Sequence, residues 1–132
     1  MRKFLLVLLI TIIAFFACWA FVFQPKTHKN NSSTLANPAS VNCVKKGGTI
    51  SIVNGPNGEY GICMFEDDRQ CEEWALYRGE CPVGGVKITG YLTDEARYCA
   101  IIGGIYTEQT NLCTRGENQC DATALYQGNC SL

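Results

Sequence analysis

The chain has 132 residues, with 11 basic and 12 acidic side chains that give a net charge of −1. This balance does not indicate nucleic acid or another polyanion as a partner. Nine cysteines, thirteen glycines and a single histidine leave few of the side chains that catalysis or metal binding commonly uses. The composition therefore favours a small cysteine-rich protein that is not an enzyme and needs no metal or cofactor.

The first 23 residues are predicted to form a membrane element. Residues 4–23 are a run of 20 without a charged side chain, preceded by Arg2 and Lys3. A helix of this length, at about 1.5 Å per residue, matches the hydrocarbon core of a bilayer. The basic flank would stay in the cytoplasm. We expect an inner-membrane anchor that holds the rest of the chain in the periplasm or outside the cell.

Two other fates of this run stay open. Cleavage by a signal peptidase would use the small residues Cys18 and Ala20, although the mature chain would then begin at the apolar residues 21–23. Lipidation at Cys18 would follow the small residue Ala17, although aromatic side chains surround this position. The alternatives to the anchor are therefore a secreted protein and a lipoprotein.

Residues 24–36, with the sequence QPKTHKNNSSTLA, are polar and lack hydrophobic periodicity, so they are predicted to be a flexible linker. The single histidine, His28, lies in this linker. A general base needs a fixed partner, which a linker does not supply. Residues 24–132 carry nine basic and 12 acidic groups, a net charge of −3.

The rest of the chain contains an internal repeat. Cys43 and Cys99 are each followed by three residues and then by two glycines. Further on, QCEEWALYRGEC at residues 70–81 and QCDATALYQGNC at residues 119–130 share seven of twelve positions. We therefore divide this part into two tandem cysteine-rich units, residues 37–82 and 83–132.

The first helix of each unit is predicted from capping residues. Asn37 precedes a proline, and Thr93 precedes two acidic residues, which suits a helix N-terminus in both cases. The paired glycines are expected to end these helices. In the first unit, residues 49–53 and 59–65 are rich in strand formers and flank the turn sequence NGPNG, which predicts a hairpin.

A second helix is expected in each unit over residues 71–78 and 120–127, followed by Gly79 and Gly128. Alanine, leucine and tyrosine recur there at helical spacing and are predicted to be core: Ala75, Leu76, Tyr77, Ala124, Leu125 and Tyr126. The predicted fold class is a small disulfide-rich α+β protein, with two tandem helix-hairpin-helix units behind an N-terminal transmembrane helix.

Eight cysteines lie outside the N-terminal run, and an even number behind an export signal predicts disulfides. Units of about 45 residues bury little surface and commonly need such crosslinks. A helix of about two turns would place Cys71 and Cys81 farther apart than a disulfide easily reaches, which disfavours this pairing without excluding it. We favour Cys43–Cys71 and Cys63–Cys81, with Cys99–Cys120 and Cys113–Cys130 in the second unit, while the third possible pairing stays open.

Other chemistry is not indicated by these side chains. Zinc sites and thiol oxidoreductases usually place two cysteines two residues apart, a spacing that this chain lacks. The acidic run at residues 66–68 lacks the spaced ligands and central glycine of a calcium loop. It is predicted to be a solvated turn.

The motifs NPASVNC, KKGG and CEEWALYRGEC, in this order, resemble a bacterial family, the domain of unknown function three hundred and thirty-three, whose members are often labelled hemolysins. The resemblance covers residues 37–81. The second unit is similar but lacks the NPAS start, the tryptophan and the arginine. The resemblance implies a bacterial cell-envelope protein and brings no catalytic residues.

The predicted function is a non-enzymatic binding module of the envelope that recognises a protein or a cell-wall component. Trp74 and Arg78 lie four residues apart on the second helix, beside Glu73, and the second unit has other residues there. Tryptophan and arginine often dominate binding energy at interfaces. We therefore select Trp74, Arg78 and Glu73 as candidate binding residues; the alternative is that Trp74 fills the core while Arg78 caps the helix.

The alternative functions are a disulfide-crosslinked protease inhibitor and a membrane-active hemolysin. A protease inhibitor would present the NGPNG turn at residues 54–58, although that turn has no basic or large apolar side chain to fill a specificity pocket. A membrane-active hemolysin would need a cationic amphipathic face or a further apolar segment, whereas residues 24–132 are acidic.

Overall fold

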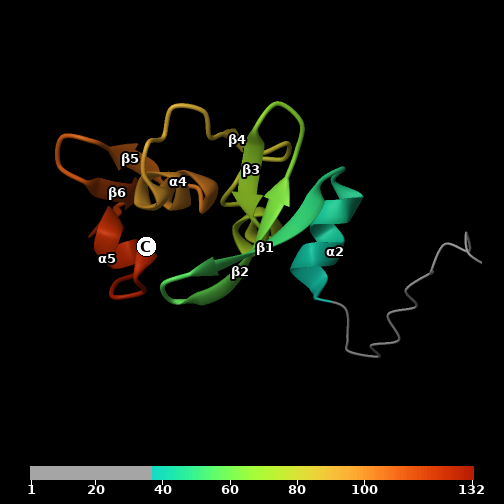
Figure 1. Cartoon of the computed structure of the whole chain (residues 1–132), viewed down its shortest axis with the longest axis horizontal. Helices are drawn as coiled ribbons and strands as arrows, with labels where there is room; N and C mark the ends of the chain where they lie inside the picture. Colours follow the sequence, from blue (N-terminus) through green and yellow to red (C-terminus); the bar gives the residue numbers. More distant parts are fainter. Residues whose placement is uncertain (1–36) are drawn as a thin grey trace, which may run out of the picture. The chain divides into compact units, whose positions relative to one another are not determined.

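A computed structural model describes residues 37–132 of the protein (Figure 1). The first segment, residues 37–82, holds α2 (Pro38–Lys45), β1 (Thr49–Gly55), β2 (Gly58–Met64), β3 (Arg69–Glu72) and α3 (Glu73–Arg78). The second segment, residues 83–132, holds β4 (Val86–Lys87), α4 (Asp94–Ile101), β5 (Ile105–Thr107), β6 (Leu112–Arg115), β7 (Asn118–Asp121) and α5 (Ala122–Tyr126).

The strands form two antiparallel sheets. One has the order β1-β2-β3-β4 and the other the order β5-β6-β7. Although β4 lies in the second segment, it pairs with β3 of the first. The register is the same in both sheets, because Cys63 lies opposite Cys71 and Cys113 lies opposite Cys120. Each segment therefore places two cysteines side by side on neighbouring strands.

The first helix of each segment begins where its capping residue predicts. The Asn37 side chain accepts a hydrogen bond from the backbone N–H of Ala39 (3.0 Å), and Pro38 is the first residue of α2. The Thr93 hydroxyl accepts one from the backbone N–H of Ala96 (3.3 Å) at the start of α4. These side chains satisfy N–H groups that have no partner within the helix.

The two glycines after each of these helices have different tasks. The first of each pair, Gly47 and Gly103, has a positive φ of 83° and 88°, which reverses the chain. The second of each pair, Gly48 and Gly104, lies against disulfide sulfurs that a Cβ atom would strike. The double glycine is therefore required by the turn and by the close approach of the crosslink.

The predicted fold class was wrong in the layout of its units. Each unit is not a helix-hairpin-helix, because a third strand, β3 or β7, separates the hairpin from the second helix. The predicted transmembrane helix falls on residues 4–23, outside the described residues, and no helix within residues 37–132 is long and apolar enough to cross a membrane. The small α+β architecture rich in disulfides is what the structure has.

All eight cysteines of the described part form disulfides, but the favoured pairing was wrong. The bonds are Cys43–Cys63, Cys71–Cys81, Cys99–Cys113 and Cys120–Cys130. Cys71 lies on β3 instead of in a helix, and α3 has only six residues before the left-handed Gly79 turns the chain back. The Cα atoms of Cys71 and Cys81 are consequently 5.9 Å apart, well within disulfide reach.

The core combines these disulfides with the apolar faces of the helices. Ala75, Leu76 and Leu125 are buried as predicted. Tyr77 is not core, since half of its side chain, 51%, is exposed. Ala124 is half-buried, and so is Tyr126, whose ring packs on Tyr98 of α4. The apolar repeat therefore predicted the inner face of each second helix but placed one tyrosine too deep.

Candidate functional site

The short helix α3 carries all three candidate binding residues, and its start is fixed by Glu72. Both carboxylate oxygens of Glu72 accept backbone hydrogen bonds, from Trp74 (3.0 Å) and from Ala75 (2.7 Å). Ala75 and Leu76 are fully buried and hold the inner face of the helix. A helix of six residues is not stable by itself, so this cap and this packing determine where its outer side chains point.

Glu73 lies below the surface, with 4% of the residue exposed. The Asn37 side-chain amide donates to its Oε1 (2.8 Å), and the Ser40 hydroxyl donates to its Oε2 (2.5 Å). Gly61 of β2 lies directly against this carboxyl group, where a Cβ atom would clash. This cluster, which we call the Asn37–Ser40–Glu73 cluster, joins α2 to α3 and keeps Glu73 from acting as a surface contact.

Trp74 and Tyr77 form an exposed aromatic pair. Their ring centroids are 5.8 Å apart in an edge-to-face arrangement, and 39% of Trp74 remains exposed. Beside Trp74 is a groove of about 300 Å³, open to solvent. It is lined by strand residues Ile52, Glu59, Tyr60 and Gly61 and by Glu72, Glu73 and Trp74.

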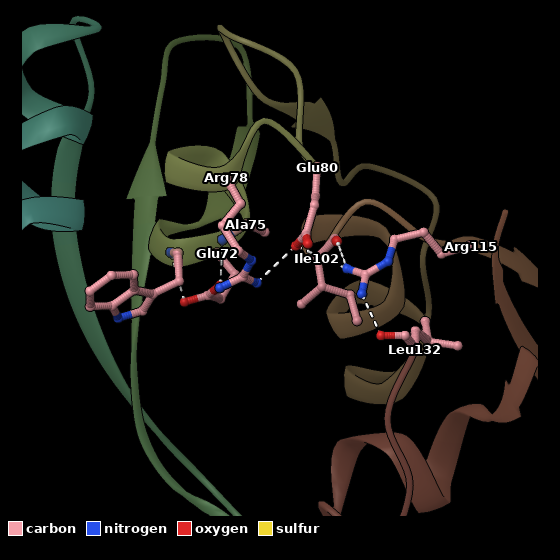
Figure 2. A network of polar contacts seen from close by, with 8 residues as sticks. Glu72, Ala75, Arg78, Glu80, Ile102, Arg115 and Leu132 are labelled. Atoms are coloured by element: carbon pink, nitrogen blue, oxygen red, sulfur yellow. Dashed lines mark hydrogen bonds and ion pairs between the residues drawn. The ribbon is translucent and has the colours of Figure 1, made fainter. Parts of the chain in front are cut away.

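The guanidinium of Arg78 lies between the side chains of Glu72 and Glu80 (Figure 2). It donates to Glu80 Oε2 (2.8 Å), and Arg115 donates to the same oxygen (3.0 Å). Arg115 also donates to the backbone carbonyls of Ile102 (3.1 Å) and Leu132 (2.6 Å). The hydrogen bond from Arg78 is the main cause that lowers the pKa of Glu80 below its ordinary value. Arg78 therefore belongs to a contact between the segments.

A group of three tyrosines forms a second contact between the segments. Tyr98 of α4 packs against Tyr60 of β2 and Tyr126 of α5, with ring centroids 5.4 Å apart in each case. Burial, followed by the neighbouring Tyr126, raises the pKa of Tyr60 to about 12. Tyr98 and Tyr126 therefore pack on one side of the β1–β2 hairpin, while Tyr60 also lines the groove beside Trp74.

The turn of that hairpin is also in contact with the second segment. A Cβ atom on Gly128 would strike the side chain of Asn57, so the turn lies directly over the backbone after α5. Residues 54–58 were the candidate loop of a protease inhibitor. A loop whose tip rests on its own chain is poorly placed to enter a protease cleft, and no observation favours that function.

The structure brings together two of the three candidate residues. Trp74 and Glu73 line the same groove, one at the surface and one beneath it, whereas Arg78 faces Glu80. Sequence reasoning missed Tyr60, Glu80 and Arg115, and it used the NPAS motif as a helix start and a family motif but assigned it no role in the site. The motif itself was the available signal, because its polar Asn37 and Ser40 need a polar partner. The possible lipidation site, Cys18, lies outside the described residues.

No cofactor or metal site is defined by the described part of the chain. Within residues 37–132 there is no group of three or more histidine, cysteine, aspartate or glutamate side chains placed to hold a metal ion. Asp67 and Asp68 of the acidic run have left-handed backbone in the exposed connection between β2 and β3. That placement agrees with the predicted solvated turn.

The fold and the groove define a small disulfide-crosslinked α+β protein with an exposed aromatic pair on α3. The chain belongs to the family described as Domain of unknown function (DUF333), which matches residues 34–80. This range includes the Asn37–Ser40–Glu73 cluster and the whole groove.

Curated relatives in three bacteria support this membership. The chain is similar to the uncharacterized protein YoaF of Escherichia coli K12, of Escherichia coli O6:H1 and of Shigella flexneri. Identity is 39% over 61 residues in each case, which covers 46% of this chain and 73% of the relative. None of these descriptions names an activity. No solved structure matches the chain significantly.

Proposed function

We propose that this protein is an exported, non-enzymatic binding module of the bacterial envelope, which recognises a protein or cell-wall component through the outer face of α3. The observation that carries the proposal is the exposed Trp74–Tyr77 pair on a helix whose other side chains are fixed. Trp74 is 39% and Tyr77 51% exposed, and their rings contact each other. Rigid aromatic side chains at the surface bind partners at a low entropic cost.

Export is supported by the four disulfides of residues 37–132. Disulfides form and persist in oxidising compartments, such as the bacterial periplasm and the cell exterior. Both a lipoprotein and a secreted protein would reach such a compartment.

A role without catalysis is supported by the side chains of the described part. The single histidine of the chain, His28, precedes it, and each of its eight cysteines is oxidised. The buried Glu73 is held by two hydrogen bonds from its own chain, so its carboxylate is engaged in structure.

We also propose that residues 83–132 are a diverged second copy of the family unit. The order of one helix, three strands and a second helix occurs in both segments once β4 is set aside. The cysteine register and the disulfide pattern are the same as well. Their shared pattern is consistent with a duplication in which only the first copy kept the aromatic surface.

Site-directed photocrosslinking tests the binding role. A photoreactive phenylalanine analogue would be placed at position 74 of the full chain in living bacteria, and in a control at Val83, which is exposed and does not line the groove. We expect a discrete crosslinked product at position 74 that is absent at position 83. Equal products at both positions, or none at position 74, would contradict the proposed function.

A further inference from the structure

The groove beside Trp74 is lined by acidic and aromatic side chains. Its charged lining residues are Glu59, Glu72 and Glu73, and no lysine or arginine of the described residues lines it. Trp74 and Tyr60 contribute aromatic surface, and Ile52 at its border is 57% exposed. The groove therefore combines negative charge with apolar surface that remains open to solvent.

The carboxylates of the groove form no ion pair within residues 37–132, although the Arg78 guanidinium lies near enough to Glu72 for Coulomb attraction. The three ion pairs of this part join Arg78 and Arg115 to Glu80 and Arg97 to Asp94. Glu72 accepts only backbone hydrogen bonds, and Glu73 accepts only neutral donors, although it is almost completely buried. An ionised buried carboxylate without a counter-ion is unfavourable, and a cation placed nearby offsets this cost.

We propose that the groove binds a lysine or arginine side chain from a basic segment of a partner polypeptide. The cation would lie over Trp74 and near the three carboxylates, where cation–π and Coulomb attraction act together. The described carboxylates are not grouped to hold a metal ion. A polypeptide suits the site because its neighbouring residues would cover exposed Ile52 and Tyr77. This inference rests on the proposed binding role of α3.

A fluorescence titration tests the ligand class. The chain has two tryptophans, Trp19 and Trp74, so Trp19→Phe in the full chain, kept in neutral detergent, makes Trp74 the sole tryptophan reporter. The probe is hexalysine amide, and its matched control is the same peptide with every amine acetylated. We expect a saturable change in Trp74 emission with hexalysine and none with the acetylated peptide.

Two charge-neutralising variants separate the groove from the overall acidity of the chain. Glu59→Gln removes an exposed groove carboxylate, and Glu117→Gln removes an exposed carboxylate of the second segment. Glu59→Gln is expected to weaken hexalysine binding about threefold, in the range of one solvent-exposed ion pair, while Glu117→Gln leaves it unchanged. Equal weakening by both variants, or an equal response to the acetylated peptide, would overturn the proposal.

A third variant tests whether the chain's own lysines occupy the groove. If hexalysine binds only after Lys26→Gln and Lys29→Gln are introduced, the occupant is the chain itself, and the proposal of a partner segment is wrong. If hexalysine fails to bind while position 74 still yields its specific crosslinked product, only the ligand class is wrong. If hexalysine does not bind and position 74 yields no specific crosslinked product, the proposed binding role is wrong as well.

Discussion

The two segments share a frame but differ in what joins their helices. In both, one disulfide ties the first helix to the second strand of the hairpin, and another closes the turn after the second helix. The polar Asn37–Ser40–Glu73 cluster occurs only in the first segment. Aligned on their cysteines and helix starts, the second segment has Thr93, Ala96 and Ala122 at these positions.

This difference indicates that the frame does not depend on the cluster. All three cluster positions carry different residues in the second segment. A change at only one of them would leave a buried polar group without its hydrogen-bond partner, which is energetically costly. Trp74 is likewise replaced by Thr123, and Arg78 by Gln127. The disulfides and paired glycines therefore serve the fold of both segments, whereas the cluster and the groove above it are specific to the first.

Removing a disulfide is expected to have the largest effect. Cys43→Ala with Cys63→Ala opens a loop of 20 residues and should lower the free energy of unfolding by about 3 kcal/mol. Cys120→Ala with Cys130→Ala opens a loop of 10 residues at a less buried site and should have a smaller effect. Urea unfolding followed by circular dichroism measures both, and equal losses would show that the segments depend equally on their crosslinks.

Disrupting the Asn37–Ser40–Glu73 cluster is expected to cause the next largest loss in the free energy of unfolding. Glu73→Ala leaves the Asn37 amide and the Ser40 hydroxyl without their acceptor and should lower the free energy of unfolding by about 2 kcal/mol. The triple variant Asn37→Thr, Ser40→Ala, Glu73→Ala installs the residues of the second segment. It should cost less than the sum of the three single changes, because no partner is left unsatisfied. Additive losses would contradict the cluster as a coupled unit.

Local signals in the sequence predicted much of the first segment. The wrong disulfide pairing has one main cause, a strand that these signals did not reveal. The caps at Asn37 and Thr93 and the hairpin were predictable because they depend on neighbouring residues. The strand β3 was missed since its four residues are too few to show a period of two and run directly into α3. That omission placed Cys71 in a helix and so produced the wrong disulfides.

The candidate site was harder to predict, because its groove is assembled from distant residues. Asn37 and Glu73 are 36 positions apart in sequence, and their contact depends on how α2 packs on α3. Arg78 was predicted to be unnecessary for the shared frame, because Gln127 stands at its position in the second segment. Its partner Glu80 is only two residues away, but the link from Glu80 to Arg115 depends on how the segments meet, which local sequence does not encode.

The tyrosine contact between the segments should be sensitive to alkaline pH. The pKa of Tyr60 is raised from 10.0 to about 12. Between these values the unfolded chain loses this proton before the folded chain does, so stability is complete below pH 10 and falls as the pH rises toward 12. The loss should be about 1 kcal/mol after discounting for partial exposure. In Tyr60→Phe, urea unfolding at several alkaline pH values should show a shallower decline.

The ion pairs of Glu80 are expected to give the smallest effect. Glu80→Gln weakens the contacts with Arg78 and Arg115, but side-chain exposures of 26% to 49% in the three residues allow water to replace them. Arg115 also keeps its bonds to Ile102 and Leu132. We therefore expect a loss of about 0.5 kcal/mol at neutral pH, and none in the control Glu117→Gln, whose side chain forms no ion pair within residues 37–132.

The pH dependence of the stability difference between the wild-type chain and Glu80→Gln shows whether the charge of Glu80 causes it. Because the folded pKa of Glu80 is lowered, its contribution is present above the pKa of the unfolded chain and disappears as the pH falls through the folded value. The stabilities of the wild-type chain and Glu80→Gln should therefore converge in acid, as measured by urea unfolding at a series of pH values. A difference that persists at a pH well below the folded value would mean that Glu80 joins the segments by packing, and that the charge itself is not what connects them.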